Sequence, residues 1–280
     1  MSSGFQPKQI TQYEASRLVE LMGNISEEVI EFSLDLIPPF KPSDVIHDNA
    51  CGAGTVSQFI LEKASPSTEG LHIDATDINP QFIAACEQLA QKNNWPLKTQ
   101  VMDVRALEFP DSYFTHSFNN LAYNTLDVAE LGLKESFRTL KPGGVVMVST
   151  WNEKAHNNAI KHASRRTRGE DSPLPLLFEA ELFEEERLKK ALNSAGFDPT
   201  KTKIHHKDVF VTIPDMKRWA QLAWSYLGFL PSGWSQGDEE KWDEAVNDLV
   251  EQLASGPGIS KNEKGETVLK YAGCIAIATK

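Results

Sequence analysis

Apolar positions follow two different patterns along this chain. Over residues 10–36 they recur at roughly helical spacing, which predicts two helices that end before Pro38 and Pro39. From residue 44 onward, short apolar runs alternate with longer amphipathic segments. This alternation is typical of strand–helix units around a parallel sheet.

The alternation predicts where each element lies. We expect strands at residues 44–48, 71–77, 97–103, 113–119 and 145–150, with helices at 55–64, 80–93 and before residue 140. Further along we expect a loop at 151–180, a charged helix at 181–195, a polar strand at 200–212, a tryptophan-rich helical region at 214–255 and a last strand at 268–279. The predicted fold is α/β: a Rossmann-like, mostly parallel seven-stranded sheet with helices on both faces.

This order of elements also predicts three parts. Residues 1–40 would form an N-terminal helical lid, and residues 41–213 with 266–280 would form the ligand-binding sheet domain. Residues 214–265 would be a helical substrate cap, inserted before the last strand.

Composition narrows the class of protein. No apolar run approaches the ~18 residues of a membrane span, and the opening residues lack the pattern of a secretory signal, so we expect a cytoplasmic protein without membrane association. The net charge of -11 opposes nucleic-acid binding. The three cysteines are far apart in sequence and lack Cys-x-x-Cys spacing, which argues against a disulfide framework and against a zinc site.

The segment at residues 45–57 carries the most informative motif. Glycines directly after a predicted strand allow close approach of a ligand to the backbone, and the next helix offers free amide groups. A dinucleotide fingerprint would have a third glycine, or an alanine, where Ser57 stands, so a pyrophosphate-binding interpretation is weakened. Asp48 would repel a pyrophosphate but attract the ammonium group of a methionine moiety, directly or through water.

The spacing Asp48-x-Ala50-Cys51-Gly52-x-Gly54 resembles the first motif of class I S-adenosylmethionine (SAM)-dependent methyltransferases. Their usual form is (Asp/Glu)-x-Gly-x-Gly-x-Gly, so this chain departs from it at Ala50. Alanine is tolerable there if the position does not need a positive φ. The resemblance implies SAM as cofactor and a small-molecule acceptor.

Further cofactor contacts are expected where the next strands end. Asp77 stands where an acid that binds ribose hydroxyls is expected. The resemblance implies that Ile78 packs on adenine and that Asp103 and the Val104 amide bind its polar edge. The remaining expected cofactor residues are Phe118 and Asn119 at the fourth strand and Tyr13 and Arg17 in the lid.

Aromatic residues suggest an acceptor pocket, because apolar ligands prefer such walls. The expected acceptor-binding residues are Tyr123, Trp151, Phe178 and Trp224. No residue is assigned firmly as catalytic, and His156 is a weak candidate for a base. Histidines inside predicted strands, such as His47, are interpreted as packing residues.

The glycine segment, the strand ending in Trp151 and the tryptophan-rich cap are similar to those of fungal natural-product methyltransferases, nearest to those that S-methylate gliotoxin-type dithiols. This resemblance implies a thiol acceptor. We also expect a monomer or weak dimer. Three alternatives stay open: a small-molecule O-methyltransferase with a base in the cap, a nicotinamide-dependent oxidoreductase, and a non-catalytic protein of the same fold.

Overall fold

The computed structural model describes residues 4–12, 14–64, 70–123, 126–175 and 185–280. The chain divides into two compact units. We call Met1–Ile25, Glu153–Glu181 and Asp208–Ala272 the helical unit, and Ser26–Asn152, Leu182–Lys207 and Gly273–Lys280 the sheet unit. The finer division into lid, sheet domain and cap stays a prediction.

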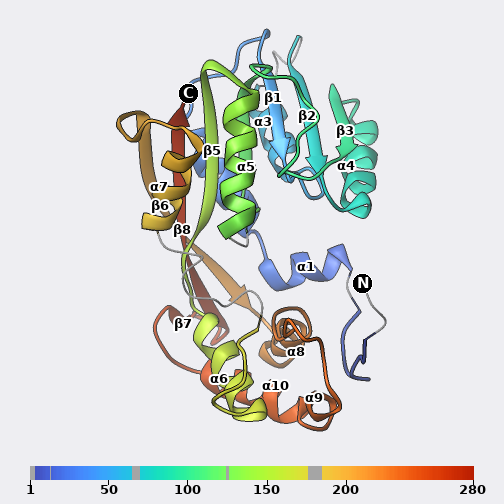
Figure 1. Ribbon diagram of the computed structural model, residues 1–280. Coiled ribbons are helices and arrows are strands. Elements are labelled where there is room, and N and C mark those ends of the chain that lie inside the picture. The colour runs from blue at the N-terminus through green and yellow to red at the C-terminus, as the bar shows by residue number, and fades with distance from the viewer. Residues whose placement is uncertain (1–3, 13, 65–69, 124–125, 176–184) are drawn as a thin grey trace. The chain divides into compact units, whose positions relative to one another are not determined.

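The strands form one sheet in the order β3-β2-β1-β4-β5-β8-β6 (Figure 1). Their bounds are β1 Val45–Asn49, β2 His72–Asp77, β3 Leu97–Val101, β4 Phe114–Asn120, β5 Leu140–Lys154, β6 Thr202–Ile213 and β8 Thr267–Thr279. Strands β1 to β5 pair in parallel, with Asp48 aligned to Ala75 on one side and to Phe118 on the other. The predicted α/β fold with a mostly parallel sheet is confirmed.

Helices of the sheet unit begin close to where the sequence predicts. They are α2 Ile25–Leu34, α3 Thr55–Ala64, α4 Pro80–Asn93, α5 Leu126–Thr139 and α7 Glu185–Ala195, with a short 3-10 helix η3 at Pro199–Lys201. The start of α4 follows from local chemistry. Asn79 accepts a hydrogen bond from the Gln81 amide, and Pro80 occupies the first turn, where its missing N–H costs nothing.

The helical unit contains α1 Ala15–Met22, α6 Asn157–Arg168, α8 Met216–Leu227, α9 Gln236–Glu240 and α10 Trp242–Gln252. Its interior holds the Arg168 guanidinium, which pairs with Asp238 at 2.6 Å and lies 4.7 Å from the Trp224 ring centroid. A carboxylate and an aromatic face together offset the cost of burying this charge. Among the described residues, no helix is long and apolar enough to span a membrane.

Two elements differ from the sequence prediction. The loop expected at residues 151–180 is wrong, because α6 occupies Asn157–Arg168. The helix is strongly amphipathic, but its buried side is built mostly from alanine, serine and threonine and its other side is basic, so its polar composition also fits a charged loop. The sheet also has an eighth strand, β7 Ile259–Lys261, which pairs antiparallel with β8.

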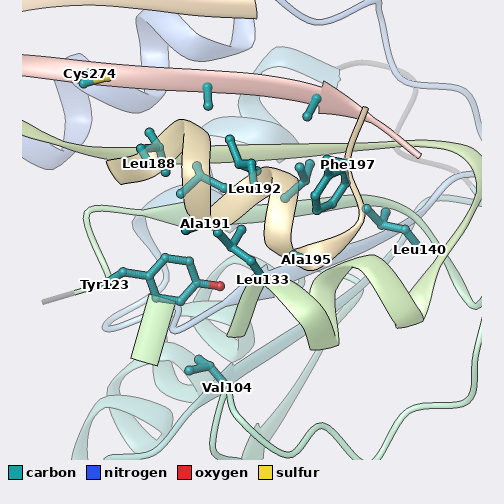
Figure 2. Packing of buried hydrophobic residues seen from close by; sticks show 14 of the residues in the cluster. Val104, Tyr123, Leu133, Leu140, Leu188, Ala191, Leu192, Ala195, Phe197 and Cys274 are labelled. Atoms are coloured by element: carbon teal, nitrogen blue, oxygen red, sulfur yellow. The ribbon is translucent and has the colours of Figure 1, made fainter. Parts of the chain in front are cut away.

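The main core of the sheet unit lies where α5 and α7 cover the sheet (Figure 2). Leu133 of α5 and Leu188 and Leu192 of α7 pack there with Phe197 and with alanines of β8. On β1, His47 stacks on Phe114 with ring centroids 4.6 Å apart, and burial lowers the pKa of His47 to about 3. His47 is therefore a neutral packing residue.

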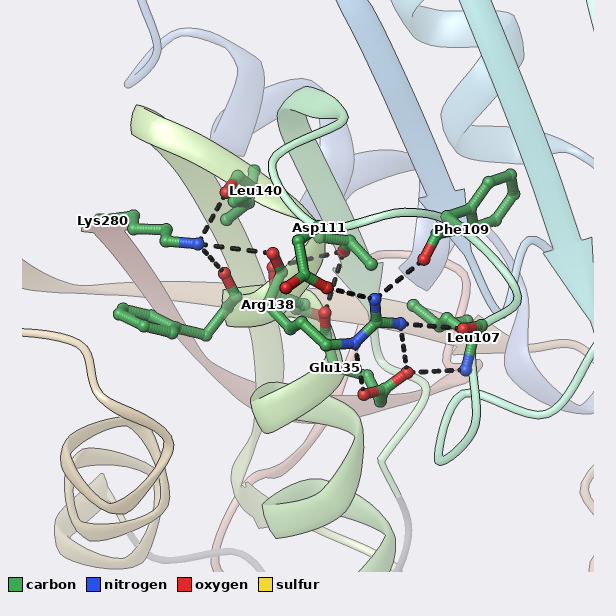
Figure 3. Close-up of polar contacts among 10 residues, drawn as sticks. Leu107, Phe109, Asp111, Glu135, Arg138, Leu140 and Lys280 are labelled. Carbon is green, nitrogen blue, oxygen red and sulfur yellow. Dashed lines mark hydrogen bonds and ion pairs between the residues drawn. The ribbon is translucent and has the colours of Figure 1, made fainter.

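The last turn of α5 is held by two cationic side chains (Figure 3). The Lys280 ammonium donates to the carbonyl oxygens of Phe137 and Leu140 at 2.6 and 2.8 Å. Arg138 donates to Glu135 and to the carbonyl of Leu107. Lys280 thus satisfies carbonyl groups at the end of α5 and places a positive charge at its negative end, while Arg138 connects the helix to the segment at Leu107.

Candidate cofactor site

The candidate site lies where parallel strands end at one edge of the sheet. Strands β1 and β4 are neighbours, but the chain runs outward from β1 to β2 and β3 on one side and from β4 to β5 on the other. The sheet order therefore reverses between β1 and β4. In open α/β sheets, ligands bind outside the carboxyl ends of the strands at this reversal.

A tight bend follows β1. Ala50, Gly52 and Gly54 all have positive φ, at 56°, 54° and 96°, and the Cys51 amide donates to the Thr76 carbonyl at 2.8 Å. A Cβ on Gly54 would lie 2.8 Å from the Cys86 sulfur, whereas a Cβ on Gly52 would meet nothing within 4 Å. Gly54 is thus required by packing, and Gly52 borders open space.

Ala50 has the positive φ that alanine disfavours. Alanine was tolerable at this motif position only if no positive φ was needed, and the structure shows that one is. A side chain in the left-handed region costs ~1–2 kcal/mol. Ala50 therefore stores strain in the binding bend, a common property of functional loops.

Asp48 lies behind this bend rather than on its surface. Its Oδ2 accepts hydrogen bonds from the Ser57 amide at 3.0 Å and the Ser57 hydroxyl at 2.6 Å. Its Oδ1 is buried and has no hydrogen-bond partner among the described residues. Burial raises the pKa of Asp48 to about 6, against the opposing effect of Ser57. The site thus contains a buried carboxylate of which one oxygen is hydrogen-bonded, and its burial as an anion disfavours folding.

Asp77 connects the second strand end to the glycine bend. Its Oδ2 accepts from the Gly52 amide at 3.0 Å, and its Oδ1 accepts from the Asn79 amide at 2.8 Å. Each carboxylate oxygen has a second lone pair, so both can still accept a ligand hydroxyl. Next to it, Ile78 leaves 62% of its surface exposed, so its side chain is accessible to a ligand.

Asp103 follows the third strand and is paired with Arg105. The guanidinium Nη2 lies 2.6 Å from Asp103 Oδ2, and this hydrogen bond lowers the pKa of Asp103. A ligand amino group would share the carboxylate with Arg105. The neighbouring Val104 side chain packs into the core, so it is the backbone at this residue that remains suited to a ligand.

The end of β4 contains polar residues that the sequence analysis did not assign. Asn120 donates to Ser26 Oγ at 2.9 Å and accepts from Ser149 Oγ at 2.7 Å. The Ser149 hydroxyl in turn accepts from the amide of Leu121, which has a positive φ of 56°. Strained non-glycine residues thus follow both strands at the reversal, and only the adjacent asparagines hinted at this in the sequence.

The two β4 residues predicted to bind cofactor are both buried. The Phe118 ring lies 6.2 Å from that of Phe40, and Asn119 donates to Ser136 of α5 at 3.5 Å. Asn119 Oδ1 has no partner among the described residues.

The residues predicted to bind the acceptor are dispersed. Tyr123 packs against Gly132 of α5 in the core of the sheet unit (Figure 2), and Trp151 lies buried beside Gly273. Trp224 is enclosed in the helical unit with Arg168. Phe178 lies outside the described residues.

The remaining predicted residues belong to the helical unit. His156 is buried, its Nδ1 lies 3.1 Å from the Tyr271 hydroxyl, and burial lowers its pKa to about 3. Arg17 pairs with Glu14 at 3.1 Å. Tyr13 lies outside the described residues.

The residues at this edge fit an adenosyl ligand with a cationic sulfonium. Gly52 borders open space, Asp77 can accept from two hydroxyls, and exposed Ile78 offers an apolar surface for a flat base. Buried polar atoms of Asp48 and Asn49 lack partners among the described residues. A diphosphate would instead meet Asp48 and Asp77.

Comparison with known proteins agrees with this arrangement. A family model described as a methyltransferase domain matches residues 46–144, which include the bend and the ends of β1 to β4. A candidate methyltransferase from Bacillus halodurans C-125 shares the fold with a TM-score of 0.60 at 14% identity, covering 90% of this chain and 99% of the other. The structure of geranyl diphosphate methyltransferase in complex with SAM has a TM-score of 0.51 at 17% identity, and the match covers 95% of this chain and 90% of the other. Residues 46–144 thus match a methyltransferase domain, and the fold is shared with solved methyltransferase structures.

Its curated relatives include fungal enzymes. It is 31% identical to acetylaranotin bis-thiomethyltransferase of Aspergillus terreus over 65% of this chain. It is 21% identical to methyltransferase tpcH of Aspergillus fumigatus over 72% of this chain. The matches span 64% and 73% of those two proteins, so the first falls short of two thirds of its relative's length.

Proposed function

We propose that this protein transfers the methyl group of SAM to a thiol of a small natural product, such as a dithiol. The cofactor part rests on one observation above all: the glycine bend, Asp77 and exposed Ile78 meet at the edge of the sheet where the strand order reverses. The acceptor part draws on the 31% identity to a fungal bis-thiomethyltransferase.

Each residue at the edge has a separate task in this proposal. Asp77 binds the ribose hydroxyls, Ile78 covers the adenine, and Asp103 with the Val104 amide binds its polar edge. The bend at Gly52 allows the backbone to approach the ligand closely, and the Asp48 charge favours the cationic methionyl part. When bound, SAM supplies a methyl group on a positively charged sulfur, ready for in-line displacement.

The protein then mainly positions the acceptor and excludes water. The acceptor sulfur gives an electron pair to the methyl carbon, the bond from that carbon to the sulfonium breaks, and the thiol proton leaves to solvent. The products are a thioether and S-adenosylhomocysteine. A thiol ionises near pH ~8.5 without help, whereas most hydroxyls need a base. The enclosure of His156 by Tyr271 and Trp219 therefore favours a thiol acceptor.

An acceptor panel tests this proposal. Matched dithiol, monothiol, phenol and amine compounds are incubated with methyl-labelled SAM, and the His156→Phe variant is assayed beside the native protein. We expect turnover with thiols only, with a rate that follows thiol ionisation and little change in the variant. Turnover of the phenol alone, abolished by the variant, would establish an O-methyltransferase instead.

A further inference from the structure

Three side chains with metal-binding atoms meet in the sheet unit, away from the carboxyl edge of β1 and β2. They are Glu185 at the start of α7, His206 on β6 and Cys274 on β8. A carboxylate oxygen, a ring nitrogen and the sulfur all lie within 4.8 Å of one another, and His206 Nε2 is 3.1 Å from Glu185 Oε2. They are distant in sequence, so their spacing gave no signal.

Access and anchoring are both present at this cluster. The His206 side chain is 56% exposed, so an ion can enter from solvent. Cys274 is fully buried at the margin of the hydrophobic core beside Leu188 (Figure 2). A thiol fixed by packing with an exposed imidazole in front of it gives a site that is open on one side.

The second ring nitrogen of His206 is also engaged. Its Nδ1 lies 3.2 Å from the side-chain amide of Asn152. The oxygen and nitrogen of an asparagine amide are assigned from the hydrogen-bond network, so with the amide flipped Asn152 Oδ1 accepts a hydrogen bond from Nδ1–H. Metal-binding histidines nearly always donate their other N–H in this way, which directs the free nitrogen at the ion. In His206 that nitrogen is Nε2, which faces Glu185.

Lys189 is the competing cation at the cluster. It forms ion pairs with Glu185 and with Glu186, the latter at 2.8 Å. If a metal ion took Glu185, Lys189 would keep its contact with Glu186. The competition therefore lowers the affinity of the site without removing it.

We propose that Glu185, His206 and Cys274 bind one Zn²⁺ ion, with water as the fourth ligand. Zinc accepts sulfur, imidazole and carboxylate ligands together in a tetrahedron with bonds of about 2.0–2.3 Å. Binding replaces the thiol proton of Cys274, which leaves to solvent, with a sulfur–zinc bond. The ion would connect α7, β6 and β8, and it takes no part in methyl transfer.

Metal titration of the untagged protein tests the site. Zn²⁺ is added in competition with a chromophoric chelator, and Co²⁺ is then used as a spectroscopic substitute. We expect one ion per chain with a dissociation constant of about 1 µM or tighter, and a cobalt–thiolate charge-transfer band. Zinc should also raise the unfolding temperature, because an ion that binds only the folded state stabilises it.

Matched variants assign the ligands. His206→Ala should abolish both the tight binding and the thermal shift, whereas His205→Ala, one residue earlier on β6, should leave both unchanged. Asn152→Leu should weaken binding by about 10-fold through loss of orientation. The proposal is overturned if native protein binds no zinc in this range, if the cobalt complex lacks the thiolate band, or if His206→Ala binds as tightly as His205→Ala.

Discussion

Asp48 offers a sharp test of the balance between stability and binding in this site. It is 1% exposed, and within the described part of the chain only its Oδ2 has hydrogen-bond partners, both on Ser57. An Asp48→Asn substitution keeps an oxygen that can accept from the Ser57 amide and hydroxyl but removes the buried charge. The amide N–H groups of the asparagine would replace Oδ1, which is buried and has no partner among the described residues, at a cost that does not change with pH. We therefore expect the stability of the variant relative to the native protein to rise with pH.

The magnitude follows from the pKa of Asp48, which burial raises from 3.8 to about 6. A carboxyl group with a raised folded-state pKa disfavours folding once the unfolded chain ionises, so stability is lost as pH rises through this window. One pKa unit corresponds to about 1.4 kcal/mol, so ionisation of Asp48 destabilises the native protein by ~3 kcal/mol at about pH 8 and by only ~1 kcal/mol at about pH 4.5. The variant should therefore gain ~2 kcal/mol relative to the native protein between these two pH values.

Urea unfolding followed by circular dichroism at these two pH values measures the gain. The same variant should bind S-adenosylhomocysteine more weakly, because the negative charge near the cationic part of the ligand is lost. Ser57→Ala serves as the companion variant: it removes a hydrogen bond that lowers the pKa of Asp48, so stability should fall more steeply with pH. A difference in stability between Asp48→Asn and the native protein that is equal at both pH values would refute the reasoning.

Three further predictions concern single positions. Ala50→Gly should raise the free energy of unfolding by ~0.5–1 kcal/mol, since φ of 56° strains alanine; a loss of stability in urea unfolding would contradict this. Ile78→Ser should weaken cofactor binding several-fold in calorimetry with stability unchanged, and Leu131→Ser, also at an exposed position, should leave binding intact. Lys280→Met should lower the free energy of unfolding by ~1–2 kcal/mol, because the carbonyl groups at the end of α5 lose their donor, and cofactor affinity should stay equal. Unchanged stability would exclude this role of Lys280.

The sequence predicted most of the fold because local and global signals agree in this chain. The helix α3 begins directly after the glycine bend, and α4 begins at the Asn79-Pro80 pair. Both starts could be predicted because each follows the end of an apolar strand. It missed α6, whose buried side is made of small and polar residues, and β7, which has three residues. The small buried residues and many charged residues of α6 are also typical of a surface loop, and three residues are too few for β7 to show a period.

The sequence was sufficient to predict which acids and glycines lie in the candidate site, but not which side chains they contact. Strand ends meet at one edge in any parallel sheet, so Asp48, Asp77 and Asp103 could be grouped from order alone. Sequence could not show that Asp48 is held by Ser57 or that Asp103 is paired with Arg105. Both contacts depend on side-chain placement, which no periodicity encodes.

The proposed function requires that the sheet edge at Gly52, Asp77 and Ile78 binds the adenosyl group. Calorimetric titration of the native protein and of Asp77→Asn with S-adenosylhomocysteine tests this most directly. We predict one site per chain, and an affinity about 10- to 100-fold lower in the variant, because two hydroxyls lose a charged acceptor. Equal affinity in the two proteins, or no binding to the native one, would contradict the account.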